Sequence, residues 1–304
     1  MRIDFSLHRP FGVSIVLAVA TALISGCAAI PTKLPPEARA KVTANDVRCF
    51  MPQETVDVQY MKSGYGAGLG LIGAIVDAGV NASLAGSAAE RAAKIREAVK
   101  HYDFRGKYWS SISNTVATTS WLQMHNFTVF PSNYVPVKAE MVVERGVFNL
   151  GTDHYLTPDH RVLGVKMGVS LFLPKEHKKA SASNMLLYHS RRMTKDEGNK
   201  AMNNWIADGA AVYKQAAEHA TRESARLLSH ALNHMYGITN GTVRPAKVKA
   251  DFTHGRGGFG IPTGRVSIKG VILEELPDRI VFQAPPGNLF SLPREDIEVT
   301  YKKK

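Results

Sequence analysis

Two neighbouring stretches decide the fold class: residues 138–151, KAEMVVERGVFNLG, and residues 161–174, RVLGVKMGVSLFLP. Every second residue from Val165 to Leu171 is apolar, which is the period of a β-strand with one buried face. The first stretch is rich in valine, a residue that favours strands. The segment between them, TDHYLTPDH, has the Asp, Thr and Pro content typical of a turn. The sequence therefore predicts a pair of strands joined by a turn.

A long helix is expected after these strands. Residues 195–236 repeat apolar side chains at helical spacing. Thr194 and Glu197 have the spacing of a capping box at its start, and Gly237 suits a left-handed C-cap at its end. Gly209 is a candidate position for a kink.

The segments before the strand pair give a second helix and an early strand. Residues 54–60 alternate apolar and polar side chains, so we expect the first ordered strand there. Residues 64–101 are expected to form a helix whose first half is rich in Gly and Ala. With the long helix, this order predicts an α+β fold for residues 54–240, with a mostly antiparallel sheet and helices packed on one face.

The C-terminal residues 245–304 have a different character. They contain TGRVSIKGVILEELPDRIVFQAPPGNLFSLPREDIEVTY, in which residues 265–274 and 279–283 have the pattern of a hairpin. Shorter strands are expected at residues 289–292 and 297–301. This series of short strands looks like a small SH3-like or Sm-like barrel, so we expect a separate small β module.

The N-terminal residues have the organisation of an export signal. Arg2 and Arg9 form a basic start, and residues 11–24 carry no charge. An uncharged run of this length is too short to cross about 30 Å of hydrocarbon, but it fits the apolar region of a signal peptide. The run ends in Leu-Ile-Ser-Gly-Cys at Cys27, which resembles the lipobox of bacterial lipoproteins. The alternative is an apolar N-terminal helix with an incidental cysteine.

This resemblance implies a place for the protein in the cell. It implies cleavage after residue 26 and acyl chains on Cys27, which would anchor the mature chain without a transmembrane span. Ala28, where Asp would favour the inner membrane, implies the outer membrane of a Gram-negative bacterium, with the protein facing the periplasm. Residues 27–53 are rich in Pro at their start and are interpreted as a lipid-anchored tether.

Charge and cysteine content narrow the range of partners. The chain has 38 Lys and Arg against 26 Asp and Glu, and outside the cytoplasm we expect no nucleic-acid partner for this excess. Anionic lipid headgroups or lipopolysaccharide phosphates are the counter-charges that this location favours, although a solvated basic surface is an alternative. Cys49 has no cysteine left to pair with, so it is either a buried hydrophobe or part of an intermolecular disulfide.

The Gly-rich stretch at residues 64–86 contains a ladder of small residues four positions apart. Such a ladder allows another backbone to come close, and packing must offset about 0.8–1.0 kcal/mol of helix propensity per glycine. Three interpretations are open: packing inside the domain, contact with another subunit or protein, or insertion in a membrane. Asp77 opposes insertion, because an acidic residue at mid-membrane costs about 2.5–3.5 kcal/mol. The ladder consists of Gly66, Gly70, Ala74, Ala78, Ala82 and Gly86.

Two motifs invite a binding site. Gly255, Gly257 and Gly260 match G-x-G-x-x-G, but a β-like segment follows where a dinucleotide site needs a helix. His230 and His234 are one turn apart on the long helix, but they lack a third zinc ligand and an adjacent Glu. We therefore expect no metal ion and no cofactor.

The segment between the two strands also invites a catalytic interpretation. It holds Asp153, His154, Asp159 and His160, yet no nucleophile elbow accompanies them, and turn chemistry accounts for the residues. We therefore expect no catalytic residue. The expected function is a structural, assembly or transport-accessory interaction protein of the cell envelope, with an envelope protein partner or self-association. The alternatives are an envelope-polymer hydrolase and a membrane-active glycine-zipper oligomer.

Overall fold

The computed structural model describes residues 32–42, 44–58, 86–87, 89–131, 145–174, 180–238, 243–251 and 265–302. The strands are β1 (Asn45–Phe50), β2 (Asp57–Val58), β3 (Met124–Val129), β4 (Gly146–Leu156), β5 (Leu163–Phe172), β6 (Ala182–His189), β7 (Arg244–Asp251), β8 (Arg265–Glu275), β9 (Arg279–Ala284), β10 (Asn288–Pro293) and β11 (Glu298–Tyr301). The helices are α2 (Pro36–Arg39), α4 (Phe104–Ala117), α5 (Lys195–Asn199), α6 (Ala201–Tyr236) and the short 3-10 helix η2 (Arg294–Asp296). Residues 89–98 are also helical.

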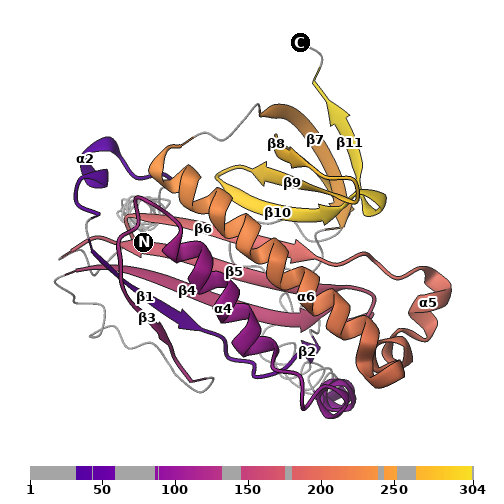
Figure 1. Ribbon diagram of the computed structural model, residues 1–304. Helices are drawn as coiled ribbons and strands as arrows, with labels where there is room; N and C mark the ends of the chain where they lie inside the picture. The colour runs from indigo at the N-terminus through magenta and orange to yellow at the C-terminus, as the bar shows by residue number, and fades with distance from the viewer. Residues whose placement is uncertain are drawn as a thin grey trace, which may run out of the picture.

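All strands of the described residues belong to one sheet. Its order is β11-β7-β8-β9-β10-β6-β5-β4-β1-β3, and β2 pairs with β4 (Figure 1). The pairs in the series β4-β5-β6 and in the series β11-β7-β8-β9-β10 are antiparallel. Four pairs are parallel: β1 with β3, β1 with β4, β2 with β4, and β10 with β6. The sheet is thus mixed, within the α and β class that the sequence predicts.

The predicted strand pair is confirmed, but its turn is shorter than expected. β4 and β5 pair from Val147 with Phe172 to Leu156 with Leu163, so residues 152–156 are strand and not turn. The side chains of Tyr155 and Leu156 are buried on opposite faces of β4, which extends the strand through both. The turn is closed by the Thr157 N–H, which donates to the Val162 carbonyl at 3.0 Å.

The predicted tether is wrong for residues 32–42 and 44–53, which belong to the folded body. β1 lies inside the sheet between β3 and β4. Val47 and Cys49 of β1, and Met51 directly after it, are fully buried at alternate positions, as expected of a segment with one buried face. Burial raises the pKa of the Cys49 thiol, so Cys49 is a buried hydrophobe and does not offer a surface thiol for an intermolecular disulfide.

The long helix begins and ends where the sequence predicts, but it is interrupted. The capping box is present: the Thr194 N–H donates to Glu197 Oε2 at 2.6 Å, and the Glu197 N–H donates to Thr194 Oγ1 at 3.2 Å. The backbone from Ala207 to Ala210 is non-helical and includes Gly209 at φ 63°, as predicted for the kink. Gly237 has φ 81° and its N–H donates to carbonyls of the last turn, which is the left-handed C-cap.

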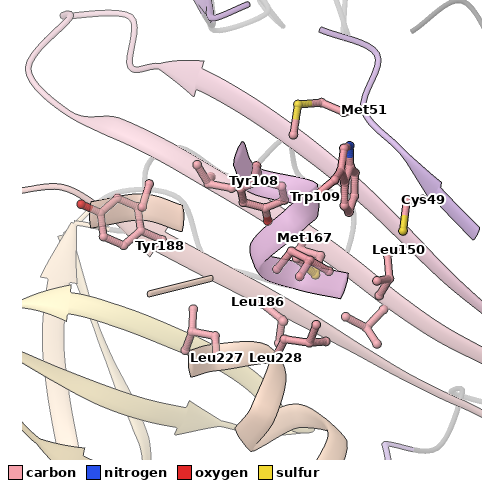
Figure 2. Packing of buried hydrophobic residues seen from close by; sticks show 14 of the residues in the cluster. Cys49, Met51, Tyr108, Trp109, Leu150, Met167, Leu186, Tyr188, Leu227 and Leu228 are labelled. Carbon is pink, nitrogen blue, oxygen red and sulfur yellow. The ribbon is translucent and has the colours of Figure 1, made fainter. Parts of the chain in front are cut away.

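α4 and α6 lie over one face of the sheet and enclose the main core (Figure 1). Leu227 and Leu228 of α6 pack in this core with Leu186 of β6 and Met167 of β5, as Figure 2 shows. Each of these side chains is at most 1% exposed. At about 1.5–3 kcal/mol for each large apolar side chain buried, this layer is the main source of stability. None of the helices in the described residues has an apolar run long enough to cross a bilayer.

The C-terminal strands enclose a second core but do not form a separate closed barrel in the described residues. β10 pairs with β6, so strands β7 to β11 continue the same sheet. The independent module expected for residues 245–304 is therefore not confirmed. The second core contains Tyr155, Met185 and Leu187 from β4 and β6, together with Ala246, Val248, Ala250, Ile272, Ile280, Phe282, Ala284, Phe290 and Leu292.

Candidate functional site

The first described residues are fixed to one end of the body. Thr32 Oγ1 donates to the Pro286 carbonyl at 2.9 Å, and Asn184 Nδ2 donates to the Thr32 carbonyl at 3.3 Å. Leu34 is 1% exposed and its N–H donates to the Met235 carbonyl at 2.8 Å. The chain therefore enters the body at the C-terminal end of α6, beside the turn between β9 and β10.

A cavity of about 170 Å³ lies at this same end. Its polar side chains come from the entering chain, from α6 and from β9, and its apolar side chains come from β8 and from the residues that follow α6 and precede β7. The cavity is lined by Lys33, His230, Asn233, His234, Ile238, Val243, Val271, Leu273 and Gln283. Gln283 Nε2 is buried and has no hydrogen-bond partner in the described residues, so one amide donor is available to a ligand.

The two histidines of the predicted helical pair both line this cavity, and each has a neighbour. His230 Nε2 is 3.2 Å from Glu274 Oε2, and His234 Nε2 is 3.4 Å from Thr32 Oγ1. Burial, helped by the charge of Lys33, lowers the pKa of His234 to about 4, so this imidazole is neutral at pH 7. In the described residues no three or more metal-ligating side chains gather, here or elsewhere.

A second polar cluster lies where α6 meets the C-terminal strands, and the sequence did not predict it. Arg279 and Glu223 are 2% and 3% exposed, and Arg279 Nη1 is 3.8 Å from Glu223 Oε2. Ser291 Oγ donates to the same carboxylate oxygen at 2.7 Å, and Arg279 Nη2 donates to the His189 carbonyl at 2.9 Å. Because Ser291 is fully buried and engaged with a carboxylate, it has no access to a substrate.

His219 extends this cluster toward solvent. Its Nδ1 is 3.1 Å from the Tyr188 hydroxyl and 3.4 Å from Arg279 Nη1, while its Nε2 is 3.8 Å from Asp278. Burial first, and then the charge of Arg279, lower the pKa of His219. The guanidinium of Arg279 also lies over the Tyr188 ring, 4.8 Å from its centre. These contacts join β6, α6 and β9 and have the character of a structural junction.

The sequence alone indicates one member of this cluster. Glu223 stands between Ala220 and Leu227, within the apolar stripe of the long helix, so helical spacing already placed a carboxylate near the core. Its partner, Arg279, opens a strand far along the chain, and the pairing of β9 with β10 and of β10 with β6 brings it within reach.

The residues of the β4–β5 connection serve the fold. Asp159 Oδ1 accepts a hydrogen bond from Thr157 Oγ1 at 2.6 Å, and the same carboxylate forms an ion pair with Arg192. The carbonyl of His160 accepts a hydrogen bond from Trp205 Nε1 at 2.5 Å. His154 is fully buried on β4, stacked on Phe104 with 4.0 Å between ring centres. The structure does not bring His154 and Asp159 together as a catalytic pair.

A wider groove of about 520 Å³ lies between α4 and the edge strand β3. Trp109, Phe127 and Val129 form its apolar part, and Asp103 and Arg105 its charged part. The Arg105 guanidinium bonds to the Phe130 carbonyl, which holds the end of β3 against α4.

Most of the predicted interaction residues lie outside the described residues. This holds for Cys27, for Gly66, Gly70, Ala74, Ala78 and Ala82, for Asp77, and for the glycines at positions 255, 257 and 260. Gly86 is described: it is helical and exposed, and a Cβ built there would meet no described atom within 4 Å. Close packing along the ladder therefore stays a prediction.

Comparison with protein-family models and with curated protein sequences finds no match.

Proposed function

We propose that this protein is a lipoprotein held by acyl chains on Cys27 in the outer membrane, facing the periplasm, and that it acts as a structural, assembly or transport-accessory interaction protein. The lipobox-like sequence that ends at Cys27 carries the proposal. The docking of Thr32 and Leu34 on the body supports it, because an anchor a few residues earlier would hold one defined end of the protein at the membrane.

Replacement of the anchor residue tests the first half of the proposal. The intact mass of the native chain is expected to show loss of residues 1–26 and addition of acyl chains. Cys27→Ala should lack the acyl mass and should leave the outer-membrane fraction in density-gradient separation. Cys49→Ala is the matched control and should fractionate as the native chain does, because Cys49 is buried. Outer-membrane fractionation of Cys27→Ala would contradict the proposal.

In-cell crosslinking with partner identification tests the second half. An interaction protein is expected to yield a defined envelope partner, and Gly70→Leu or Ala74→Leu should abolish the crosslink if the ladder forms the contact. Crosslinks only between copies of this chain would favour the glycine-zipper oligomer instead. Release of small products from envelope polymers, lost in Asp159→Asn or His160→Ala, would favour the hydrolase.

The SH3-like or Sm-like resemblance of residues 245–304 belongs to the same proposal. Two observations support it: β11 pairs back onto β7, and strands β7 to β10 contribute most of a second apolar core. Such a module would serve as the part of the body that presents a surface to the partner.

A further inference from the structure

The end of the body where the chain enters carries exposed apolar and basic side chains together. Ile238 is 42% exposed and Val243 is 38% exposed, and both line the cavity that also contains Lys33. These residues follow α6 and precede β7, so they lie beside the point where Thr32 is fixed. Figure 1 shows α2 and the C-terminal end of α6 at this same end of the molecule.

The basic character continues onto the neighbouring strands. Val271 lines the cavity, and Lys269, two positions away on β8, lies on the same face of the sheet. Lys269 is directly opposite Lys247 of β7, and both are exposed. Like charges in register repel each other, and within the part of the chain that the structure describes neither lysine has an acidic partner at ion-pair distance.

Two carboxylates of β8, Glu274 and Glu275, are already paired with basic groups of the protein. Glu274 is in contact with Arg226 and His230, and Glu275 is in contact with Arg244 and Arg294. The lysine pair and the cavity thus present net positive charge next to exposed aliphatic side chains. We name Lys33, Ile238, Val243, Lys247 and Lys269 the tether-side surface.

The position of the anchor decides what covers this surface. Only five residue steps separate Cys27 from Thr32, which is at most about 18 Å of extended chain. A body fixed to the membrane by so short a connection must turn this end toward the lipid. Basic side chains beside apolar ones match the phosphate layer and the outermost acyl carbons of a bilayer.

We propose that the tether-side surface rests on the anionic phospholipid headgroups of the membrane that receives the Cys27 lipid, and that the adjoining cavity takes one headgroup. In the cavity, Lys33 supplies a positive charge, and Gln283 Nε2, which has no partner among the described residues, supplies a hydrogen-bond donor for a phosphate oxygen. The inference rests on the proposed lipid anchor. To the proposed anchor it adds a fixed orientation of the body on the membrane and the class of lipid that the body contacts.

The experiment compares a position at the tether-side surface with an equally exposed position far from it. Both positions follow the kink in α6. Ile238, two residues after the end of α6, is 42% exposed. Val212 is 45% exposed and lies about 36 Å along the helix axis from Tyr236, at 1.5 Å per residue. Ile238→Cys and Val212→Cys are labelled with an environment-sensitive fluorophore in the full lipidated chain. Cys49 is buried and Cys27 carries the lipid, so the unsubstituted chain serves as the unlabelled control.

Both labelled proteins are reconstituted in vesicles of equal parts phosphatidylcholine and phosphatidylglycerol that contain brominated lipid as quencher. The Ile238 label should be quenched and the Val212 label should not. Lys247→Glu and Lys269→Glu in the Ile238→Cys chain should lower the equilibrium constant for lipid contact by at least about fivefold for each reversed lysine. In vesicles of phosphatidylcholine alone, lipid contact of the Ile238 label should fall to a similar extent.

Three outcomes would overturn the inference. The first is an Ile238 label no more quenched than the Val212 label. The second is quenching that survives both lysine reversals with an unchanged thermal unfolding midpoint. The third is a chain without acyl mass on Cys27, which overturns the proposed function as well. In the first two outcomes the chain still carries its lipid, so the proposed function stands.

Discussion

The two sides of α6 hold the protein together by different means. On one side, Ala217, Ala220, Leu228 and Ala231 pack on the sheet with no exposed surface. On the other side, a row of polar side chains faces the C-terminal strands, formed by His219, Glu223, Arg226 and His230. A helix that turns 100° per residue keeps these two rows apart from Ala217 to Ala231.

The two sides of α6 differ in how their contacts respond to pH, to salt and to the loss of a partner. The apolar side depends on area removed from water, so it does not titrate and salt does not screen it. The polar side depends on partners in fixed places, because an unpaired charge in the buried part is costly. We infer that the apolar side supplies most of the stability, and that the polar side fixes where β9 and β10 lie against the helix.

The largest expected effect comes from breaking the buried pair on the polar side. Glu223→Ala leaves the Arg279 guanidinium buried without its carboxylate and should lower the free energy of unfolding by about 3–5 kcal/mol. Urea denaturation measures it. The double variant Glu223→Leu with Arg279→Leu should recover most of the loss. A double variant as unstable as Glu223→Ala would show that the pair itself is a net source of stability.

Truncation on the apolar side should cost somewhat less and should not depend on conditions. Leu228→Ala removes a fully buried side chain and leaves a cavity, for which we expect a loss of about 3 kcal/mol. The same loss is expected in low and high salt, and at pH 6 and pH 8. A salt-dependent loss at Leu228 would break the distinction between the two sides.

A buried histidine of the main core should make the folding stability of the protein fall in acid. Burial lowers the pKa of His154 to about 3, below its unfolded value of 6.5, so the unfolded chain takes up the proton first. Stability is complete above pH 6.5 and declines as the pH falls from there toward 3, by about 2 kcal/mol between pH 6.5 and pH 5. His154→Phe should flatten this part of the pH profile of the urea midpoint. An unchanged slope would assign the pH dependence to other groups.

The smallest effect is expected at the outer end of the polar row. Glu274 is partly exposed and contacts His230 at 3.2 Å and Arg226 at 3.7 Å. Because solvent screens such pairs, Glu274→Gln should lower the free energy of unfolding by about 0–1 kcal/mol. An effect as large as that of Glu223→Ala would mean that the whole polar row acts as one buried unit.

Local pattern predicted much of the fold. The alternation around Val165, the capping box at Thr194, and Gly237 were enough to place a strand and both ends of the long helix. The early strand β1 was missed because prolines upstream gave its surroundings the character of a tether, although Val47 and Cys49 already alternate with charged residues. The extent of β4 was missed because Asp and Thr also suit turns, and only pairing with β5 keeps residues 152–156 extended.

By itself the sequence determined what each segment can be, because periodicity, caps and the lipobox-like end at Cys27 depend on neighbouring residues alone. Tertiary structure decided which segments meet. It placed β10 beside β6, which joins the C-terminal strands to the main sheet, and it brought Arg279 to Glu223 from more than fifty positions away. It also assembled Lys33, Gln283 and His234 around one cavity. Such contacts depend on the geometry of the whole sheet and helix, which no local pattern contains.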